Sequence, residues 1–538
     1  MSQEHSRGSG WQQQEPVRRG PHGAGSRGRP VAAWLLEWVL LSLLLALALV
    51  ALLAARSPHF IPDDAYITFR YARNLAAGEG FVYNSGERVL GTSAPLWAIL
   101  LAVGRVIAPG CDTPVAAQAI SILFYLLAGV LVFVIVRWDL CASMHVRPAV
   151  ALAWGLLAAA LWLSSQQAVN AALSGMETML FAFLILLAAH AFDRSANIGA
   201  GAVLGVALVT RIDAVVAIGC LVIWCLVHER RAIVPVLGGA VALALPWYLF
   251  SWLYFGSPLP NTVVAKTVMY AHTEWAWSRA EMLRGFMGGV SDLPLLLAAM
   301  AGLLGLLRGR TVMWLAGFPF AYAIFCLVFV ARPQAWYFVP CWPAAIVAAV
   351  TATASLSPTR DSASSPGGRT WLARFVPGGG LSAASAAAIA GAIVLGIIAT
   401  WHGIRSIQGV REARDFPGDG LDKIGFRLAR EASRETVFIG DIGVVGWHSG
   451  LRVYDFAGLV TPEAISWNRS RWNYSGRISI DYRALLAQIE RVRPEFVVLA
   501  DYMAFRAETV DAPEFREWYG EAMRAGENTL YKRRGIGS

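Results

Sequence analysis

The chain has 538 residues, of which 56% are hydrophobic and only 15% are charged. A typical soluble domain has about 45–50% apolar and about 25% charged residues, so this composition excludes an ordinary soluble protein and predicts a polytopic membrane protein. The formal net charge of +9 comes largely from arginines beside apolar segments. It therefore indicates membrane orientation and argues against nucleic-acid binding.

The first thirty residues are rich in glycine, arginine, glutamine and serine. A segment of this composition cannot bury a core, so we expect a disordered tail over residues 1–30. Five arginines precede the first apolar segment, and the positive-inside rule places this tail in the cytoplasm.

Eleven apolar segments have roughly the length needed to cross about 30 Å of hydrocarbon. They cover residues 31–54, 115–136, 148–163, 177–192, 198–209, 214–227, 232–254, 293–307, 312–330, 335–354 and 382–401. Arginines cluster in alternate loops, near residues 137–147, 194, 230–231, 308–310 and 360–374. All of these loops face the cytoplasm with eleven spans, as the positive-inside rule requires. We therefore predict a membrane module over residues 31–402 and an extracytoplasmic domain over residues 403–538.

Two long loops, residues 56–114 and 255–292, fall on the outer side under this count. In the first, residues 64–77 carry apolar side chains at helical spacing, while residues 95–108 predict a short helix lying at the membrane interface. The second contains Ser-Pro-Leu-Pro-Asn-Thr at residues 257–262, and its two prolines predict extended backbone.

Beyond the last span the pattern is that of a small soluble domain. A stretch rich in serine, proline and glycine at residues 355–380 predicts a linker before that span. Strands are expected at 436–439, 452–456 and 496–499, and helices at 421–433 and 482–491. This alternation predicts an α/β domain. The six cysteines lie in or near spans and indicate neither a disulfide framework nor a CxxC metal site.

Polar side chains that are unusual for a membrane protein gather on the predicted outer side. The candidate site residues are Asp63, Asp64, Arg70, Arg73, Glu177, Arg211, Asp213, Asn261, Lys266, Trp336 and Tyr337. Ionisable residues near hydrocarbon are expensive and usually functional. A carboxylate can deprotonate an acceptor hydroxyl, and arginine or lysine can hold a lipid phosphate and stabilise a leaving group. The combination predicts sugar transfer from a lipid phosphate.

Each candidate also has an ordinary structural interpretation. Asp63 and Asp64 can cap a helix beginning at Ala65, and Arg70 and Arg73 can extend toward lipid headgroups. The remaining alternatives are a helix cap for Glu177, an ion pair between Asp213 and Arg211, a solvated turn for Asn261 and Lys266, and interfacial anchoring for Trp336 and Tyr337.

Five strings together resemble a bacterial family of GT-C membrane glycosyltransferases. They lie at residues 63–97, 170–184, 208–217, 254–266 and 441–463, and begin with DDAYITFRYARN, NAALSGMETM, LVTRIDAVVA, YFGSPLPNTV and DIGVVGWHSG. The family includes the terminal β-(1→2) arabinofuranosyltransferases of the actinobacterial cell wall and pilin arabinosyltransferases. This resemblance implies an inverting transfer from a polyprenyl-phosphate sugar, with an aspartate of the first outer loop as base.

Asp63 and Asp64 both match the position of that base, and the sequence leaves open which of them acts. The resemblance further implies that Arg70, Glu177, Arg211, Asn261 and Lys266 line the donor and acceptor groove. The chain departs from the family pattern at Leu90, where an acidic or polar residue is common, at Gly91–Thr92, which lack the usual intervening tyrosine, and at Ile212, where proline is usual.

The leading hypothesis is therefore a glycosyltransferase of the plasma membrane, with a lipid-linked arabinofuranose or related pentose as donor and a cell-envelope glycan or glycoprotein as acceptor. A transporter or flippase of a lipid-linked sugar is the alternative, although transporters usually show internal repeats and polar sites at the bilayer midplane. An inactive scaffold with a glycan-binding outer domain is a third possibility. No cofactor is implied, and the need for a divalent cation is left open.

Overall fold

A computed structural model describes residues 31–55, 61–270, 310–330, 334–355, 420–431, 435–470, 482–503 and 505–535, with short stretches between 390 and 408. The chain divides into two compact units, residues 1–43 and residues 44–538. Apart from helix α1, which begins in the first unit and ends in the second, everything below concerns the second unit. The predicted tail over residues 1–30, the span at 293–307 and most of the linker lie outside the described residues.

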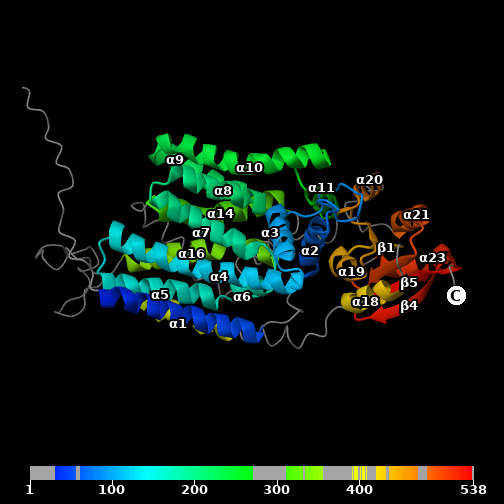
Figure 1. The fold of residues 1–538 in the computed structure, drawn as a ribbon, viewed down its shortest axis with the longest axis horizontal. Coiled ribbons are helices and arrows are strands. Elements are labelled where there is room, and N and C mark those ends of the chain that lie inside the picture. The colour runs from blue at the N-terminus through cyan, green and yellow to red at the C-terminus, as the bar shows by residue number, and fades with distance from the viewer. Residues whose placement is uncertain are drawn as a thin grey trace, which may run out of the picture. The chain divides into compact units, whose positions relative to one another are not determined.

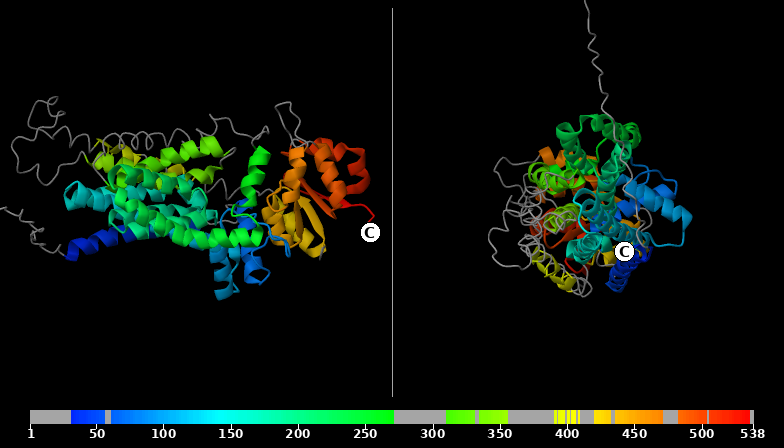
Figure 2. Two further views of the ribbon diagram at one scale, coloured as in Figure 1. Left: turned by 90° about the horizontal axis from the view of Figure 1, so that it is seen from above. Right: turned by 90° about the vertical axis from the view of Figure 1, so that its left-hand side faces the viewer.

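The larger part of the described chain is helical (Figure 1). Its elements are α1 (Val31–Ala55), α2 (Asp63–Ala76), α3 (Pro95–Ile107), α4 (Thr113–Trp138), η2 (Asp139–Ser143), α5 (Pro148–Ser164), α6 (Gln166–Leu173), α7 (Thr178–Asp193), α8 (Asn197–Thr210), α9 (Ala214–His228), η3 (Arg230–Ala232), α10 (Ile233–Phe255), α11 (Asn261–Tyr270), α14 (Arg310–Phe329), α15 (Ala335–Phe338) and α16 (Cys341–Ala354). The long helices α4, α5, α7, α8, α10, α14 and α16 lie side by side (Figures 1 and 2).

Only some of the described helices are both long and apolar enough to cross a membrane. Among the described residues, Thr113–Ala142 and Arg230–Phe255 are long and apolar enough to cross a membrane. The pair α5 and α6, bent by 57°, would form a third if it crosses as one span. Several shorter apolar helices match other predicted segments, but the count of eleven is not confirmed.

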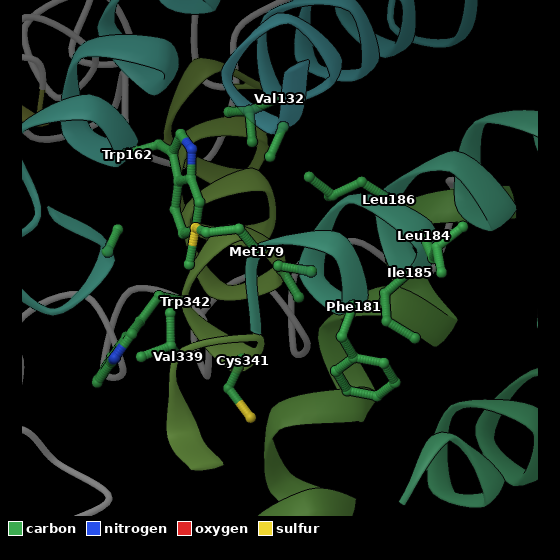
Figure 3. Packing of buried hydrophobic residues seen from close by; sticks show 14 of the residues in the cluster. Val132, Trp162, Met179, Phe181, Leu184, Ile185, Leu186, Val339, Cys341 and Trp342 are labelled. Carbon is green, nitrogen blue, oxygen red and sulfur yellow. The ribbon is translucent and has the colours of Figure 1, made fainter. Parts of the chain in front are cut away.

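Close packing joins the apolar helices. Val132 of α4, Trp162 of α5, Met179 and Phe181 of α7 and Trp342 of α16 are all at most 3% exposed. Figure 3 shows these side chains gathered between the helices. Because lipid is as apolar as these side chains, shape-matched contact contributes more to helix association in a membrane than removal of apolar surface from water.

Glycines allow the backbones of α8 and α10 to approach closely. A Cβ atom added at Gly201 or Gly205 of α8 would overlap the carbonyl groups of Val236 or Ala240 on α10. Small residues at helix crossings serve this purpose in membrane proteins. The glycines of these two predicted spans therefore fix their packing.

The break between α5 and α6 leaves backbone carbonyls that need donors. Gln118 of α4 donates from Nε2 to the carbonyl of Leu173 at 2.8 Å, and the hydroxyl of Tyr125 donates to that of Leu163 at 2.5 Å. A backbone carbonyl without a hydrogen bond costs on the order of several kcal/mol of free energy in an apolar medium. Polar residues in the otherwise apolar α4 thus support the bent segment.

The C-terminal part folds as an α/β domain. It contains α18 (Leu421–Glu431), β1 (Thr436–Ile439), α19 (Ile442–Ser449), β2 (Arg452–Asp455), α20 (Pro462–Ser470), α21 (Tyr482–Val492), β3 (Phe496–Ala500), α22 (Arg506–Asp511), α23 (Pro513–Trp518), β4 (Tyr519–Ala525) and β5 (Asn528–Arg533). The sheet order is β2-β1-β3-β5-β4; β1 pairs in parallel with β2 and β3, while β5 pairs antiparallel with β3 and β4. The three expected strands and two expected helices are confirmed. The β4–β5 hairpin was not predicted.

Candidate functional site

The two acidic residues open helix α2. Pro62 occupies the N-cap position, and neither Asp63 nor Asp64 makes a side-chain capping bond to this helix. The interpretation that they cap a helix beginning at Ala65 is therefore wrong, because α2 begins at Asp63 itself. Both carboxylates lie in the first turn, where negative charge is favoured by the helix dipole.

Asp63 caps a different helix, one that lies nearly four hundred residues further along the chain. Its two carboxylate oxygens accept hydrogen bonds from the backbone N–H groups of Gly443 at 2.8 Å and Val444 at 2.7 Å, in the first turn of α19. Burial raises the pKa of Asp63 well above its usual value, and the nearby Asp441 raises it further. A Cβ atom at position 443 would overlap the backbone of Asp63, so glycine is required there.

Asp64 instead faces the second outer loop. Its Oδ2 lies 3.3 Å from the Nζ of Lys266 on α11, and about a third of each side chain is exposed, 33% and 31% respectively. Exposed ion pairs contribute little to stability. The arrangement therefore leaves one carboxylate of the acidic pair accessible beside a cation while the other is occupied.

Arg70 is buried in the contact between α2 and the α/β domain. It is 3% exposed, and its guanidinium donates to the carbonyls of Tyr83 at 2.8 Å, Gly446 at 2.7 Å and Leu451 at 2.7 Å, and to Oδ1 of Asn84 at 3.3 Å. A guanidinium has five N–H donors, and these four hydrogen bonds engage all three of its nitrogens. The structure therefore places Arg70 in an interface and not at a lipid phosphate, contrary to the sequence-based prediction.

Arg73 has a related position. Its Nη1 donates to the carbonyl of Trp447 at 2.8 Å, and its guanidinium lies 4.8 Å from the centre of the Trp447 ring. Burial lowers the pKa of Arg73 to about 10. Neither Arg70 nor Arg73 extends freely from α2, so the headgroup interpretation of both residues does not fit either.

Asn84 pairs with the edge of the sheet as a strand would. Its Oδ1 accepts from the N–H of Val453 at 3.0 Å and its Nδ2 donates to the carbonyl of Val453 at 2.9 Å. Val453 belongs to β2, which is an edge strand. Nearby, Glu87 forms a 2.6 Å ion pair with Arg452. These bonds join the loop that contains Asn84 and Glu87 directly to the α/β domain.

Glu177, Arg211 and Asp213 form a buried ionic network between α7, α8 and α9. Arg211 lies 2.8 Å from Asp213 and 3.2 Å from Glu177, and its guanidinium stacks 4.8 Å from the ring centre of Tyr337. Tyr322 of α14, which the sequence did not indicate, donates a hydrogen bond to Asp213. The predicted ion pair between Arg211 and Asp213 is confirmed. Arg211 is thus held by protein carboxylates.

This network lies near the exposed carboxylate. The charge of Asp64 acts on Glu177, more weakly than those of Arg211 and Asp213 do, so Asp64 lies within electrostatic range of the network. Trp336, beside Tyr337 on α15, packs against the helical core. Asn261 is held elsewhere, by the carbonyls of Gly458 and Leu459.

No metal centre can be assigned within the described part of the chain. It contains no group of three or more histidine, cysteine, aspartate or glutamate side chains arranged to hold a metal ion. The six cysteines are free thiols. Among the described residues, the candidate site offers the carboxylate of Asp64, the ammonium group of Lys266 and the ionic network of Glu177, Arg211 and Asp213.

Comparisons with known proteins give one match in the domain, one relative and several solved structures. Residues 408–531 match a family described as a domain of unknown function, DUF8728. The terminal β-(1→2)-arabinofuranosyltransferase of Mycobacterium tuberculosis is 29% identical over 223 residues, which are 38% of this chain and 35% of the relative. The match thus spans about a third of the relative's length. It confirms the resemblance drawn from the sequence.

The fold is similar to that of ArnT from Cupriavidus metallidurans. The structure bound to undecaprenyl phosphate aligns with a TM-score of 0.58 and 16% identity, covering 94% of this chain and 99% of that one. The apo structure aligns with a TM-score of 0.59 and 13% identity, covering 93% and 98%. At this identity the comparison establishes a shared fold.

Proposed function

We propose that this chain is an inverting glycosyltransferase that moves a sugar from a polyprenyl-phosphate donor to a hydroxyl acceptor at the outer face of the plasma membrane. The observation that carries the proposal is the accessible pair of Asp64 and Lys266, within electrostatic range of the buried network of Glu177 and Arg211. A fold shared with a protein solved with undecaprenyl phosphate supports a lipid-linked donor.

In the proposed reaction Asp64 is the general base. Its carboxylate takes the proton from the acceptor hydroxyl as the hydroxyl oxygen attacks the anomeric carbon of the sugar. The bond from that carbon to the phosphate oxygen breaks, and its electron pair leaves with the lipid phosphate. A single displacement on the face opposite the leaving group inverts the anomeric configuration.

Lys266 has the position to stabilise the leaving group. In the resting protein it neutralises Asp64, and a donor phosphate entering beside it would offer a second anionic partner. A cation that meets developing negative charge lowers the barrier more than one that binds substrate and transition state equally. The role proposed for Lys266 is therefore phosphate contact, and Arg70 is assigned to the interface.

The name of the sequence relative supports arabinofuranose or a related pentose as the transferred sugar. The acceptor that we propose is a cell-envelope glycan or glycoprotein. The comparisons give the transporter alternative no support. Loop charge supports a cytoplasmic N-terminus and an outward-facing α/β domain.

The direct test is donor consumption by the purified protein. We expect incubation with a panel of polyprenyl-phosphate sugars and an envelope-glycan acceptor to consume a pentose donor and release lipid phosphate. The Asp64→Asn variant should bind the same donor without consuming it. If the protein consumes none of the donors in a panel that includes arabinofuranose, glucose and mannose, the proposal is contradicted.

A further inference from the structure

Asp455 is a fully buried carboxylate at the end of strand β2, and it has no exposed surface. Its carboxylate is hydrogen-bonded by the loop that follows, residues 456–461, here called the β2 loop. The carboxylate accepts from the backbone N–H groups of Ala457 at 2.8 Å, Leu459 at 2.5 Å and Val460 at 3.2 Å. Burying a carboxyl group is costly unless its oxygens are hydrogen-bonded. These bonds fold the β2 loop into one shape.

The folded β2 loop holds the start of helix α11. The Nδ2 of Asn261 donates to the carbonyls of Gly458 at 2.6 Å and Leu459 at 3.0 Å. From the other side, the backbone N–H of Asn261 donates to the carbonyl of Leu90 at 2.8 Å. Asn261 is the first residue of α11, so this helix begins at a point fixed by both the first outer loop and the α/β domain.

Helix α11 in turn carries Lys266 to Asp64. The helix is only 10 residues long, and Val263 and Val264 on its surface are exposed. Its other contacts are mainly with α20, which follows the β2 loop directly. A helix this short is marginal by itself and takes its position from tertiary contacts. Movement of the β2 loop would consequently move Lys266.

We propose that Asp455 is a positioning residue for the pair of Asp64 and Lys266, acting through the β2 loop and Asn261. Its effect on catalysis rests on the proposed function, whereas its effect on the geometry of Lys266 does not. In Asp455→Asn an amide N–H₂ group replaces one acceptor oxygen and meets backbone N–H donors, so the β2 loop cannot keep its shape. Lys266 should then leave Asp64.

The geometry can be tested without any activity assay, because Lys266 is one of only three lysines in the chain, with Lys423 and Lys532. The full-length protein in detergent would be treated with an amine-acylating reagent, and the labelling rate of each lysine followed by mass spectrometry. We expect Asp455→Asn to raise the rate at Lys266 by about threefold or more, as release of an ammonium group from a carboxylate makes it more reactive. Lys423 should label at an unchanged rate.

Two further variants make this experiment decisive. Asn261→Ala removes the hydrogen bonds between α11 and the β2 loop and should also speed labelling of Lys266. This variant allows the test to be made even if Asp455→Asn fails to fold. Asp501→Asn is the control, because Asp501 follows strand β3, which is parallel to β2 in the same sheet, but pairs with Arg506 and Arg524. Labelling of Lys266 at the wild-type rate in folded Asp455→Asn or Asn261→Ala protein would overturn the proposal.

Kinetics provide the second measurement. Misplacement of the base and its cation should lower kcat by about tenfold in Asp455→Asn while the KM for donor stays within about twofold. The double variant with Asn261→Ala should be no slower than the slower single variant, since both act on one chain of contacts. Multiplicative effects, or an equal loss in Asp501→Asn, would reduce Asp455 to a stabilising role. If the wild type transfers no sugar, the proposed function fails and the labelling result still decides the geometry.

Discussion

Replacement of Arg70 by methionine distinguishes an interface from a phosphate site. Methionine keeps the apolar length of the side chain but removes every donor. The carbonyl of Leu451 then loses its hydrogen bond from Arg70, whereas the carbonyls of Tyr83 and Gly446 keep those from Asn74 and from the N–H of Gly450. An unsatisfied buried acceptor costs about 1 to 3 kcal/mol, and a hydrogen bond to a charged group contributes about as much. We therefore expect a total loss of roughly 2 to 4 kcal/mol.

The loss should appear as separation of the α/β domain from α2. Thermal melting in detergent should shift downward, and limited trypsin digestion should cut faster around residues 442–459. Donor affinity of the remaining folded protein should match wild type. Arg88→Met is the control, because exposed Arg88 only stacks on Tyr254 at 4.6 Å. A large drop in donor affinity with unchanged melting would instead return Arg70 to the phosphate site and refute this reasoning.

Three other outcomes are expected. Gly446→Ala puts a Cβ atom against the Tyr83 hydroxyl and 2.9 Å from Arg70 Nη1, so it should destabilise the domain contact by about 1 to 3 kcal/mol, whereas Gly104→Ala, with open space around it, should leave melting unchanged. Burial raises the pKa of Asp455 from 3.8 to about 7, so between these values the folded protein retains a proton that the unfolded chain releases. The melting temperature should therefore fall as the pH rises from about 4 to 7. The Asp455→Asn variant should show a smaller fall over the same range. In a Cys111→Ser background, cysteines at Ser85 and Glu514 should both react with an impermeant thiol reagent in intact cells; labelling of only one would exclude a shared outer face.

Much of the fold could be predicted from local pattern. Helix α2 carries Ile67 and Tyr71 one turn apart, and β1 and β3 are continuous apolar runs, so periodicity identified them. The hairpin of β4 and β5 was missed because β4, Tyr519–Ala525, mixes charged and apolar residues and is only half-buried. Its turn depends on Gly526 with a φ of +57°, which is not evident from hydropathy.

The candidate site was predicted only in part, for a physical reason. An arginine near a membrane surface has the same sequence signal whether it binds a phosphate or three backbone carbonyls, and Arg70 proved to do the second. The partners of Asp63 lie 380 and 381 residues away, beyond any local pattern. Tyr322 lies among apolar residues in helix α14, and nothing in its sequence neighbours indicated a hydrogen bond to Asp213.

The division of roles within the acidic pair is the central claim, and one comparison tests it most directly. Turnover and melting would be measured side by side for Asp63→Asn and Asp64→Asn. Removal of the base should lower turnover of Asp64→Asn by roughly a hundredfold or more with unchanged melting. Asp63→Asn should lose one of two charge-assisted bonds to α19, with destabilisation of about 1.5 to 3 kcal/mol and a much smaller loss of turnover. Wild-type turnover in Asp64→Asn, or a hundredfold loss in a fully stable Asp63→Asn, would contradict the account.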